Sequence, residues 1–432
     1  MCWSIFFRSF ASGNKSSYSG HAIVPRAQDT QAVMGRCHVR ALFEFGKTPL
    51  FFEHPREVIV CHTPSGLEGC FERLERAVAA GYYAAGFFSY EAGYALEPAL
   101  DYPGRAGFPL MCLGVFDEPL RQRPLIPRER FRLEHVHPGI SREDHARGIS
   151  RIHAHIRAGD VYQITYCLPW KLSVHGSSYS LYRALLQRQP VPYPAYIETG
   201  CYRILSLSPE MFVRKEKDCL TAKPMKGSWP RGGVHDVFGG LWLRGDPKNR
   251  AENVMIADLL RNDLGRIGDA VQVPRLFEVA RYRTIFQMTS TVTARIAPQA
   301  AFLDIFRAIF PSGSVTGAPK VKAMEIIGSL EPWPRRIYTG AVGWITPQRD
   351  FFFNVPIRTI LLEGARGEDC PIRVQLKSIA AAVLIAVLLP ISGITNAAIR
   401  QGDYLWIQLS NSYDQLSGIF RTFLKKEYFS KT

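Results

Sequence analysis

The chain has 432 residues, of which 47% are apolar and 21% charged; this composition is typical of globular proteins and excludes a mainly disordered chain. Its length allows one large core or two to three domains of ordinary size. The formal net charge of +15 favours an anionic partner, and we expect a small polyanionic metabolite and no nucleic acid, because Lys and Arg are scattered without a dense basic block.

Residues 1–40 form an irregular extension rich in Ser, in which five basic residues accompany a single acid, Asp29. From residue 41 onward, short strand-like runs alternate with helical ones. This alternation lacks the strict strand–helix–strand rhythm of a parallel sheet, so we expect an α+β fold. Residues 364–432 differ in character from the part that precedes them.

Apolar residues at helical spacing predict helices over residues 66–80, 142–158, 251–267, 301–310 and 319–329. Gly159 is a normal helix stop after the second of these. Strand-like runs are expected around residues 162–167, 196–197, 203–207, 211–214, 338–345 and 351–360. Residues 104–140, rich in Pro, Arg and Gly, are interpreted as a surface excursion.

The first candidate site residue is Glu252, near the start of the third predicted helix. It lies four residues before Ile256 and therefore projects along the apolar stripe of that helix. A buried carboxylate needs a partner, and a hard cation such as Mg²⁺ binds carboxylate oxygen together with water and substrate. The alternative is that Glu252 only complements the helix dipole.

A loop of small residues, Pro311–Lys320, opens the last predicted helix. Its exposed N–H groups and its hydroxyl groups suit an anion, and the candidate ligands are Gly313, Ser314, Thr316 and Gly317. The spacing of a P-loop is missing, and many such loops are plain turns.

Lys226 lies in a turn-like segment, residues 223–228. A lysine in a partly dry pocket loses its proton and serves as a nucleophile, although most lysines are solvated surface residues. Arg358, in the strand-like run Asn354–Thr359, suits bidentate binding of a carboxylate; an ordinary structural ion pair is the alternative.

Taken in chain order, these segments resemble the chorismate-binding enzymes, which include anthranilate, isochorismate and salicylate synthases and aminodeoxychorismate synthases. The resemblance runs from about residue 43 to 362 and rests on collinear motifs at residues 87–94, 159–163, 206–210, 223–228, 251–266, 313–320 and 357–359. It implies a large fold of two packed, mainly antiparallel sheets with helices outside. Residues 41–140 would be its N-terminal part and residues 141–363 its chorismate-binding catalytic region.

A lysine at position 226 is typical of the aminodeoxychorismate synthases, whereas anthranilate synthases usually carry a small residue there. The resemblance therefore implies that the Lys226 amine attacks C2 of chorismate as the C4 hydroxyl leaves. Glu210 would transfer protons to that hydroxyl and from the incoming ammonia. The product would be 4-amino-4-deoxychorismate, a precursor of p-aminobenzoate and folate.

The same resemblance implies that Arg358, Tyr338 and the Gly313–Gly317 loop hold a substrate carboxylate, and that Glu252 binds Mg²⁺. Ammonia would be free or would come from a separate glutamine amidotransferase subunit. The nine cysteines include no Cys-x-x-Cys pair, which is typical of reduced thiols in a cytoplasmic protein.

The C-terminal residues depart from the family pattern, which ends in a Gly-rich strand and a Glu-rich helix carrying a second Mg²⁺ carboxylate. Here the chain contains the apolar run Ile379–Ile399 instead. This run is interpreted as a membrane helix, a buried core helix, or foreign sequence from a reading-frame or fusion event. Two other functions therefore stay open: an enzyme like anthranilate synthase component I, or a catalytically impaired chorismate-family binding or regulatory protein that contacts a membrane only through 379–399.

Overall fold

The computed structural model describes residues 38–104, 107–127, 129–231, 235–283 and 285–364, together with the backbone of residues 372–377. The N-terminal extension up to residue 37 and the apolar run 379–399 lie outside these residues, so the interpretations given for them stay predictions. In the described ranges, no helix combines the length and the apolar character needed to cross a bilayer.

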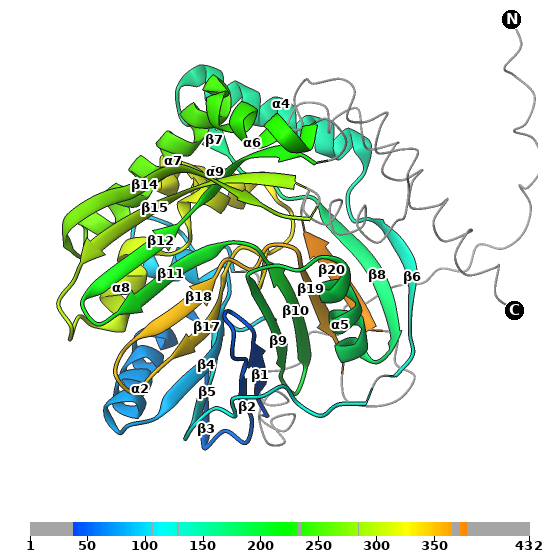
Figure 1. The fold of residues 1–432 in the computed structure, drawn as a ribbon, viewed down its shortest axis with the longest axis vertical. Coiled ribbons are helices and arrows are strands. Elements are labelled where there is room, and N and C mark those ends of the chain that lie inside the picture. Colours follow the sequence, from blue (N-terminus) through cyan, green and yellow to red (C-terminus); the bar gives the residue numbers. More distant parts are fainter. Residues whose placement is uncertain are drawn as a thin grey trace, which may run out of the picture. The chain divides into compact units, whose positions relative to one another are not determined.

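Two large antiparallel sheets dominate the fold (Figure 1). The strands of sheet A are β1 (Arg40–Phe43), β2 (Leu50–Phe52), β6 (Phe131–Pro138), β8 (Pro169–Gly176), β9 (Tyr193–Glu198), β10 (Tyr202–Ser208), β19 (Thr359–Glu363) and β20 (Ile372–Lys377). Their order across the sheet is β2-β1-β9-β10-β19-β20-β8-β6. Two strands from the C-terminal part of the chain, β19 and β20, therefore lie side by side between β10 and β8.

The strands of sheet B are β3 (Glu57–Cys61), β4 (Tyr83–Phe88), β5 (Met111–Phe116), β11 (Met211–Glu216), β12 (Cys219–Lys223), β13 (Met225–Pro230), β14 (Asp269–Arg281), β15 (Ile285–Arg295), β17 (Ala341–Ile345) and β18 (Phe351–Asn354). They follow the order β13-β15-β12-β11-β18-β17-β4-β5-β3, and β14 also pairs with β15. A short separate ladder joins β7 (Gln163–Ile164) to β16 (Gly317–Ala318). The predicted α+β fold with antiparallel sheets is confirmed.

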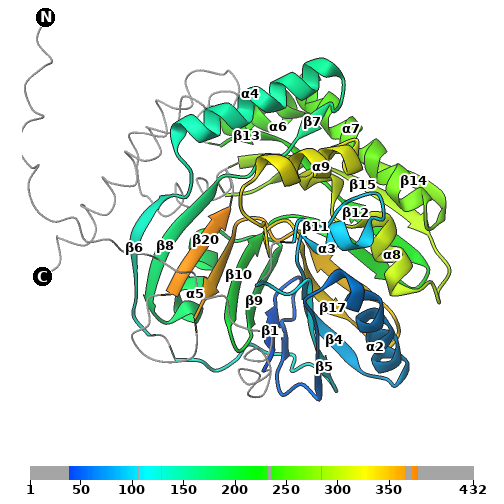
Figure 2. The ribbon, with the colours of Figure 1, turned by 180° about the vertical axis from the view of Figure 1, so that it is seen from behind.

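The helices are α2 (Leu67–Ala79), α3 (Ala92–Leu96), α4 (Arg142–Ala158), α5 (Ser178–Arg188), α6 (His235–Gly245), α7 (Pro247–Gly265), α8 (Phe302–Ile309) and α9 (Lys320–Leu330). Helix α5 packs on sheet A, while α2, α7 and α8 cover the outer face of sheet B (Figures 1 and 2). Between the sheets, buried Phe43 from β1 and Phe87 from β4 belong to one apolar cluster. The two sheets thus share a core, because each has an apolar inner face.

Several sequence-based boundaries need correction. Residues 104–140 are not only a surface excursion, because they contain β5, whose six residues are all buried between β4 and the edge strand β3 of sheet B. The expected strand 351–360 is two strands, β18 and β19, that belong to different sheets. Pro356 and the left-handed Arg358 (φ 52°) lie in the connection, and neither conformation continues a strand.

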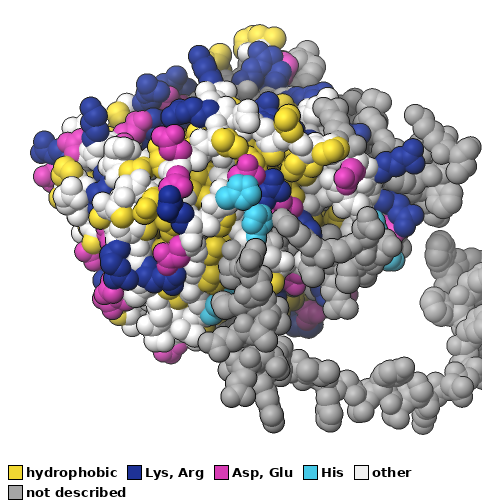
Figure 3. Space-filling view, turned by 90° about the horizontal axis from the view of Figure 1, so that it is seen from below, with side chains coloured by type: hydrophobic (Ala, Val, Ile, Leu, Met, Phe, Trp, Pro, Cys, Tyr) yellow, Lys and Arg dark blue, Asp and Glu magenta, His cyan; other side chains and the backbone are white. Residues whose placement is uncertain are grey.

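The surface charges do not form a single block on the face shown in Figure 3, where basic and acidic side chains are interspersed. Exposed ion pairs elsewhere in the fold, such as Arg73–Glu57 and Arg295–Asp269, also combine the two signs of charge. The net charge of +15 therefore favours the approach of anions in general and does not mark one binding surface.

Candidate active site

Lys226 lies on β13, an edge strand of sheet B, and its residue is only 6% exposed. The next residue, Gly227, has a φ of +94°, and a Cβ at that position would lie 3.0 Å from Asn249. Glycine is therefore required to turn the strand after the lysine. The carbonyl oxygen of Lys226 accepts a hydrogen bond of 3.2 Å from Asn253 Nδ2.

Burial lowers the pKa of the Lys226 ammonium, and the negative charges of Glu252 and Glu210 oppose this effect. The amine therefore loses its proton more readily than a lysine in water does. A buried amine that loses its proton readily has the properties of a nucleophile. The expected turn-like segment is wrong, because Lys226 lies on a strand, but its burial fits the expectation of a partly dry position.

Glu210 lies where the chain passes from β10 in sheet A to β11 in sheet B, and it is 3% exposed. Its Oε1 accepts a hydrogen bond of 2.5 Å from Ser314 Oγ. Burial raises the pKa of Glu210 to about 7, although the Ser314 hydrogen bond and the Lys226 charge each act to lower it. A carboxyl group with such a pKa can give and take a proton near neutral pH.

The Gly313–Gly317 loop contributes to this site mainly through Ser314. A Cβ on Gly313 would lie 2.5 Å from Leu259 Cδ2, so this glycine permits close packing against α7. The Thr316 hydroxyl donates to Ser312 O at 3.1 Å, and the N–H of Val315 donates to the same carbonyl. These donors maintain the shape of the loop, and Ser314 is the loop residue whose side chain reaches Glu210.

A buried, ion-paired arginine, Arg335, holds the Gly313–Gly317 loop in place. Arg335 donates to Val315 O at 2.9 Å and to Thr165 O at 2.6 Å. The same guanidinium binds both carboxylate oxygens of Glu331, at 2.7 and 2.9 Å. A buried charge with all these partners is stable. It fixes the Gly313–Gly317 loop against Thr165, in the segment between β7 and β8.

Arg358 lies in the connection between the sheets and is 7% exposed. Among the described residues, nothing accepts a hydrogen bond from its Nε or Nη1. Burial lowers the pKa of Arg358, while nearby Tyr282 and Tyr338 act in the opposite direction. Because buried donors without acceptors are costly, this guanidinium is a candidate for binding an anion.

Tyr282 is a further residue of the candidate site, and no sequence motif indicated it. It interacts electrostatically with both Arg358 and Glu210, and burial raises its pKa to about 12. Tyr338, which the resemblance did indicate, is 5% exposed and faces the same arginine. Lys226, Glu210, Tyr282 and Arg358 thus form one continuous neighbourhood.

Asn253, Gln287 and Ser290 are further residues that sequence reasoning did not assign to the site. Ser290 Oγ donates to Asn253 Oδ1. Gln287 Nε2 donates to Gly227 O at 2.8 Å, and its Oε1 accepts from Ser228 at 3.0 Å. These side chains hold the carbonyl groups of Lys226 and Gly227. The pairing of β13 with β15 brings Gln287 there, and α7 supplies Asn253.

Glu252 lies in the second turn of α7, because the helix begins at Pro247 and not at residue 251 as expected. Asp246 caps the helix and accepts from Asn249 N at 2.7 Å, so it already satisfies a free donor there. The Glu252 side chain is 26% exposed, lies 3.9 Å from Lys248 Nζ, and acts electrostatically on Lys226. Its position beyond the first turn weakens its interaction with the helix dipole, and its charge acts on Lys226, so the metal role stays a prediction.

The donor set for Mg²⁺ is only partly supplied by the described residues, among which no three His, Cys, Asp or Glu side chains gather as a metal site. Glu252 offers one carboxylate at the Lys226 end of the site. This arrangement suits Mg²⁺, which is often bound through one or two carboxylates with water and substrate oxygens, but it does not by itself build a complete site.

A family model described as chorismate binding enzyme matches residues 119–373. Aminodeoxychorismate synthase component 1 of Klebsiella aerogenes is 37% identical over 225 residues, 51% of this chain and 50% of that protein. Anthranilate synthase component 1 of Pseudomonas aeruginosa is 35% identical over 258 residues, 57% of this chain and 52% of that protein. The chain thus spans about half the length of these curated relatives.

The fold is similar to that of anthranilate synthase component I from Streptococcus pneumoniae, with a TM-score of 0.62 and 22% identity. The alignment covers 88% of this chain and 95% of that structure. At this identity the likeness concerns the fold alone. It agrees with the two packed sheets and outer helices described above.

Proposed function

The chain belongs to the family of chorismate-binding enzymes, and on this basis we propose that it aminates chorismate at C4 to give 4-amino-4-deoxychorismate. The observation that carries the proposal is the buried Lys226 amine, whose pKa is lowered by burial and which interacts with Glu210 and Glu252. The relatives named aminodeoxychorismate synthase support the same activity.

In the first proposed step, the neutral Lys226 amine bonds to C2 of the ring while the bond between C4 and its hydroxyl breaks. The protonated Glu210 carboxyl gives its proton to that hydroxyl, which leaves as water. A pKa of about 7 keeps a useful fraction of Glu210 protonated at neutral pH. Ser314 orients the carboxyl through its short hydrogen bond.

In the second step, ammonia bonds to C4 and the bond between C2 and the lysine nitrogen breaks. The lysine nitrogen keeps the electron pair of the broken bond and is released as a neutral amine, so Lys226 is regenerated. Glu210, now a carboxylate, takes one proton from the new C4 ammonium and returns to its starting form. The net change is replacement of the hydroxyl by an amino group, with release of water.

Chorismate carries two carboxylates, and Arg358, whose Nε and Nη1 lack acceptors among the described residues, is proposed to bind one of them. Tyr338 and Tyr282 flank this guanidinium and are proposed to orient the same carboxylate. The Gly313–Gly317 loop closes the site beside Glu210. Fixed donors of this kind reduce the entropy lost when the ring is aligned with the amine.

Glu252 is proposed to supply one carboxylate oxygen to Mg²⁺. When bound, this cation would hold the second substrate carboxylate and withdraw electron density from the ring. Glu252→Gln is expected to remove the dependence of chorismate binding on Mg²⁺, measured by calorimetric titration with and without the metal. Equal Mg²⁺ dependence in the wild type and the variant would rule out this role.

Ammonia is proposed to come from solution or from a separate glutamine amidotransferase subunit, in keeping with the component 1 names of the relatives. Free ammonium is therefore the nitrogen source for the test. The purified full chain is incubated with chorismate, ammonium and Mg²⁺, and the products are separated by chromatography and identified by mass spectrometry. Aminodeoxychorismate is the expected product.

Lys226→Ala is expected to abolish this product, and Lys223→Ala, on the same segment but paired with Glu278 at the edge of the site, is the matched control. Rapid quenching should show chorismate minus water attached to Lys226. Retention of full aminodeoxychorismate synthesis in Lys226→Ala would overturn the nucleophile. Anthranilate and pyruvate from the wild type would favour the second candidate, an anthranilate synthase, which the relative from Pseudomonas aeruginosa supports.

A further inference from the structure

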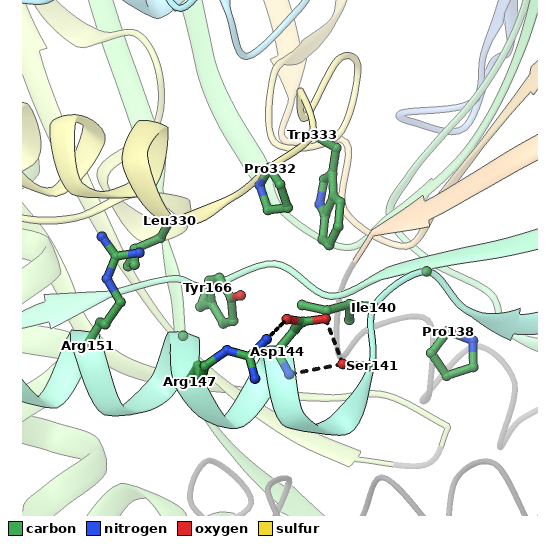
Figure 4. Close-up of a pocket in the computed structure, with 12 residues that line it drawn as sticks. Pro138, Ile140, Ser141, Asp144, Arg147, Arg151, Tyr166, Leu330, Pro332 and Trp333 are labelled. Carbon is green, nitrogen blue, oxygen red and sulfur yellow. Dashed lines mark hydrogen bonds and ion pairs between the residues drawn. The ribbon is translucent and has the colours of Figure 1, made fainter. Parts of the chain in front are cut away.

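A cavity of about 670 Å³ lies between the first half of α4 and the segment that follows α9 (Figure 4). The side chains of Ile140, Leu330 and Trp333 and the ring of Tyr166 form much of its lining. None of the residues proposed to act on chorismate lines it. Pockets of roughly 300–1,000 Å³ are the usual size for small-molecule sites, so this cavity has room for a ligand of its own.

The charged side chains of the lining are Asp144, Arg147 and Arg151, and all three lie on α4. Asp144 and Arg147 form an ion pair, and Ser141 Oγ donates a hydrogen bond of 2.7 Å to Asp144. Arg151 makes neither an ion pair nor a hydrogen bond in the part of the chain that the structure describes. One positive charge at the cavity therefore has no counterpart among these residues, which favours an anionic ligand.

Tyr166 adds a second donor beside this charge. Its hydroxyl lies directly over Gly148, where a Cβ would come within 2.5 Å of the Tyr166 oxygen. Asp144 and Arg151 flank Gly148 at four and three residues on the same face of α4. Burial raises the pKa of Tyr166 to about 12, although the Arg151 charge acts to lower it. The hydroxyl therefore keeps its proton, and a guanidinium next to an O–H group suits a carboxylate.

The wall opposite α4 is apolar. In Figure 4, Pro332 and Trp333 project toward the helix, and Tyr166 lies between them and α4. Leu330 is buried and Trp333 is partly exposed, so the indole ring offers a surface that a ligand can cover. An aromatic ring packs well on such a surface, while its carboxylate reaches the donors on the other side.

Both walls of the cavity are joined by the buried carboxylate of Glu331. Glu331 lies between the lining residues Leu330 and Pro332, and its residue is 2% exposed. Its Oε1 accepts a hydrogen bond of 2.9 Å from the backbone N–H of Cys167, which follows Tyr166 in the chain. A movement of the Tyr166 segment is therefore felt at the segment after α9, and the reverse is also true.

Arg335 connects these walls to the catalytic loop. It binds Glu331, and it donates to the carbonyl of Thr165, which precedes Tyr166, at 2.6 Å. The same guanidinium donates to Val315 O at 2.9 Å, within the Gly313–Gly317 loop that contains Ser314. The cavity thus lies behind the ion pair that holds the loop in contact with Glu210.

We propose that this cavity binds an aromatic carboxylate that acts as an effector of the site. Its carboxylate is held by Arg151 and the Tyr166 hydroxyl, and its ring lies against Leu330 and Trp333. By joining α4 to both walls, the ligand steadies the Gly313–Gly317 loop. Occupation therefore tightens chorismate binding, and chorismate tightens effector binding by the same factor. This regulatory effect rests on the proposed function, whereas the binding site itself does not.

Benzoate is the probe for the binding site. The full chain carries Arg358→Met, so that the proposed site for the substrate carboxylate does not contribute, and its tryptophans are replaced by fluorotryptophan. The fluorine resonance of position 333, assigned by its loss in Trp333→Phe, should shift in a saturable way as benzoate is added. Adding Arg151→Met should raise the Kd about tenfold or more. Arg157→Met, exposed on the same helix outside the cavity, is the matched control and should leave the Kd unchanged.

Acetate, which lacks the ring, and benzamide, which lacks the charge, should each bind about tenfold more weakly than benzoate. The site would be overturned if benzoate caused no saturable shift of the position-333 resonance. A Kd that is the same with and without Arg151→Met, or equal binding of acetate, would overturn it too.

Hydrogen exchange measures the effect on the loop without any turnover. In the Arg358→Met chain, peptides covering residues 311–320 should exchange about threefold more slowly with saturating benzoate, and Arg151→Met should abolish this difference. In the wild type without ammonium, benzoate should lower the Kd for chorismate. Saturable benzoate binding with unchanged loop exchange would overturn the effector role. A protein that binds both ligands but forms no aminated product would refute the proposed function and leave the effector site in place.

Discussion

Ser314 Oγ lies 2.5 Å from Glu210 Oε1 and donates a hydrogen bond to it. The two residues are 104 positions apart in the chain. The bond joins the Gly313–Gly317 loop to the crossing between the two sheets. It also lowers the pKa of Glu210, which we propose transfers protons at C4 of the substrate. The hydrogen bond stabilises the charged carboxylate, which is the form that burial disfavours.

Ser314→Ala should therefore raise the pKa of Glu210 above its value of about 7. Protonated Glu210 is the form that releases the C4 hydroxyl, so the alkaline limb of the kcat/KM profile should move upward by about half a unit to one unit. The profile of amination rate against pH, measured with saturating ammonia, checks this. A limb that moves downward would contradict the assignment. Glu210→Gln, the control, should lack the limb.

Arg358→Met should weaken chorismate binding while making the free protein more stable. The methionine removes a buried charge with donors that lack acceptors, which should raise the free energy of unfolding by about 1 to 3 kcal/mol. It also removes the charged hydrogen bonds to the substrate carboxylate, which should raise the Kd for chorismate about 100-fold or more.

Urea unfolding and calorimetric titration measure the two effects of Arg358→Met. Arg261→Met, on the exposed side of α7, is the control and should change neither quantity appreciably. A variant that binds chorismate normally would show that the carboxylate is held elsewhere. Reduced stability would show that Arg358 has a structural partner in the free protein.

Asn253→Ala should lower kcat more than it changes KM. Asn253 is 1% exposed and holds the carbonyl of Lys226, so its loss frees the turn that aims the amine without touching the carboxylate-binding groups. A drop in kcat of about 10- to 100-fold is expected. Steady-state kinetics measure both constants. Asn262→Ala, at an exposed position on the same helix, is the control that separates this effect from a general disturbance of α7. A change confined to KM would exclude a positioning role.

Lys320→Met should destabilise the fold strongly, because it leaves the buried Asp263 carboxylate without the ammonium 2.8 Å away. Burial raises the pKa of Asp263 and the Lys320 charge opposes that rise, so the pair depends on both partners. The single variant should lose about 3 to 5 kcal/mol of unfolding free energy. The double variant Lys320→Met/Asp263→Leu should lose much less. Additive losses in this thermodynamic cycle would show that the two groups do not interact.

The sequence by itself determined the elements whose signals are local. Helix α4 has the predicted bounds, because Ser141 caps it through Asp144 N and Gly159 ends it in a left-handed conformation (φ 81°). Helices α2, α8 and α9 lie within one or two residues of their predicted ends, since their apolar spacing is regular. The collinear motifs also identified the family.

Only the tertiary structure decided what those residues can do. The loss of solvent that lowers the pKa of Lys226 and raises that of Glu210 depends on strands and helices distant in the sequence, and no local pattern encodes it. The same holds for Arg358, which stands between two sheets and not in a strand, and for Tyr282, which no motif marked. Periodicity and caps act over a few residues, whereas desolvation and electrostatic contact act through space, and the fold alone brings those partners together.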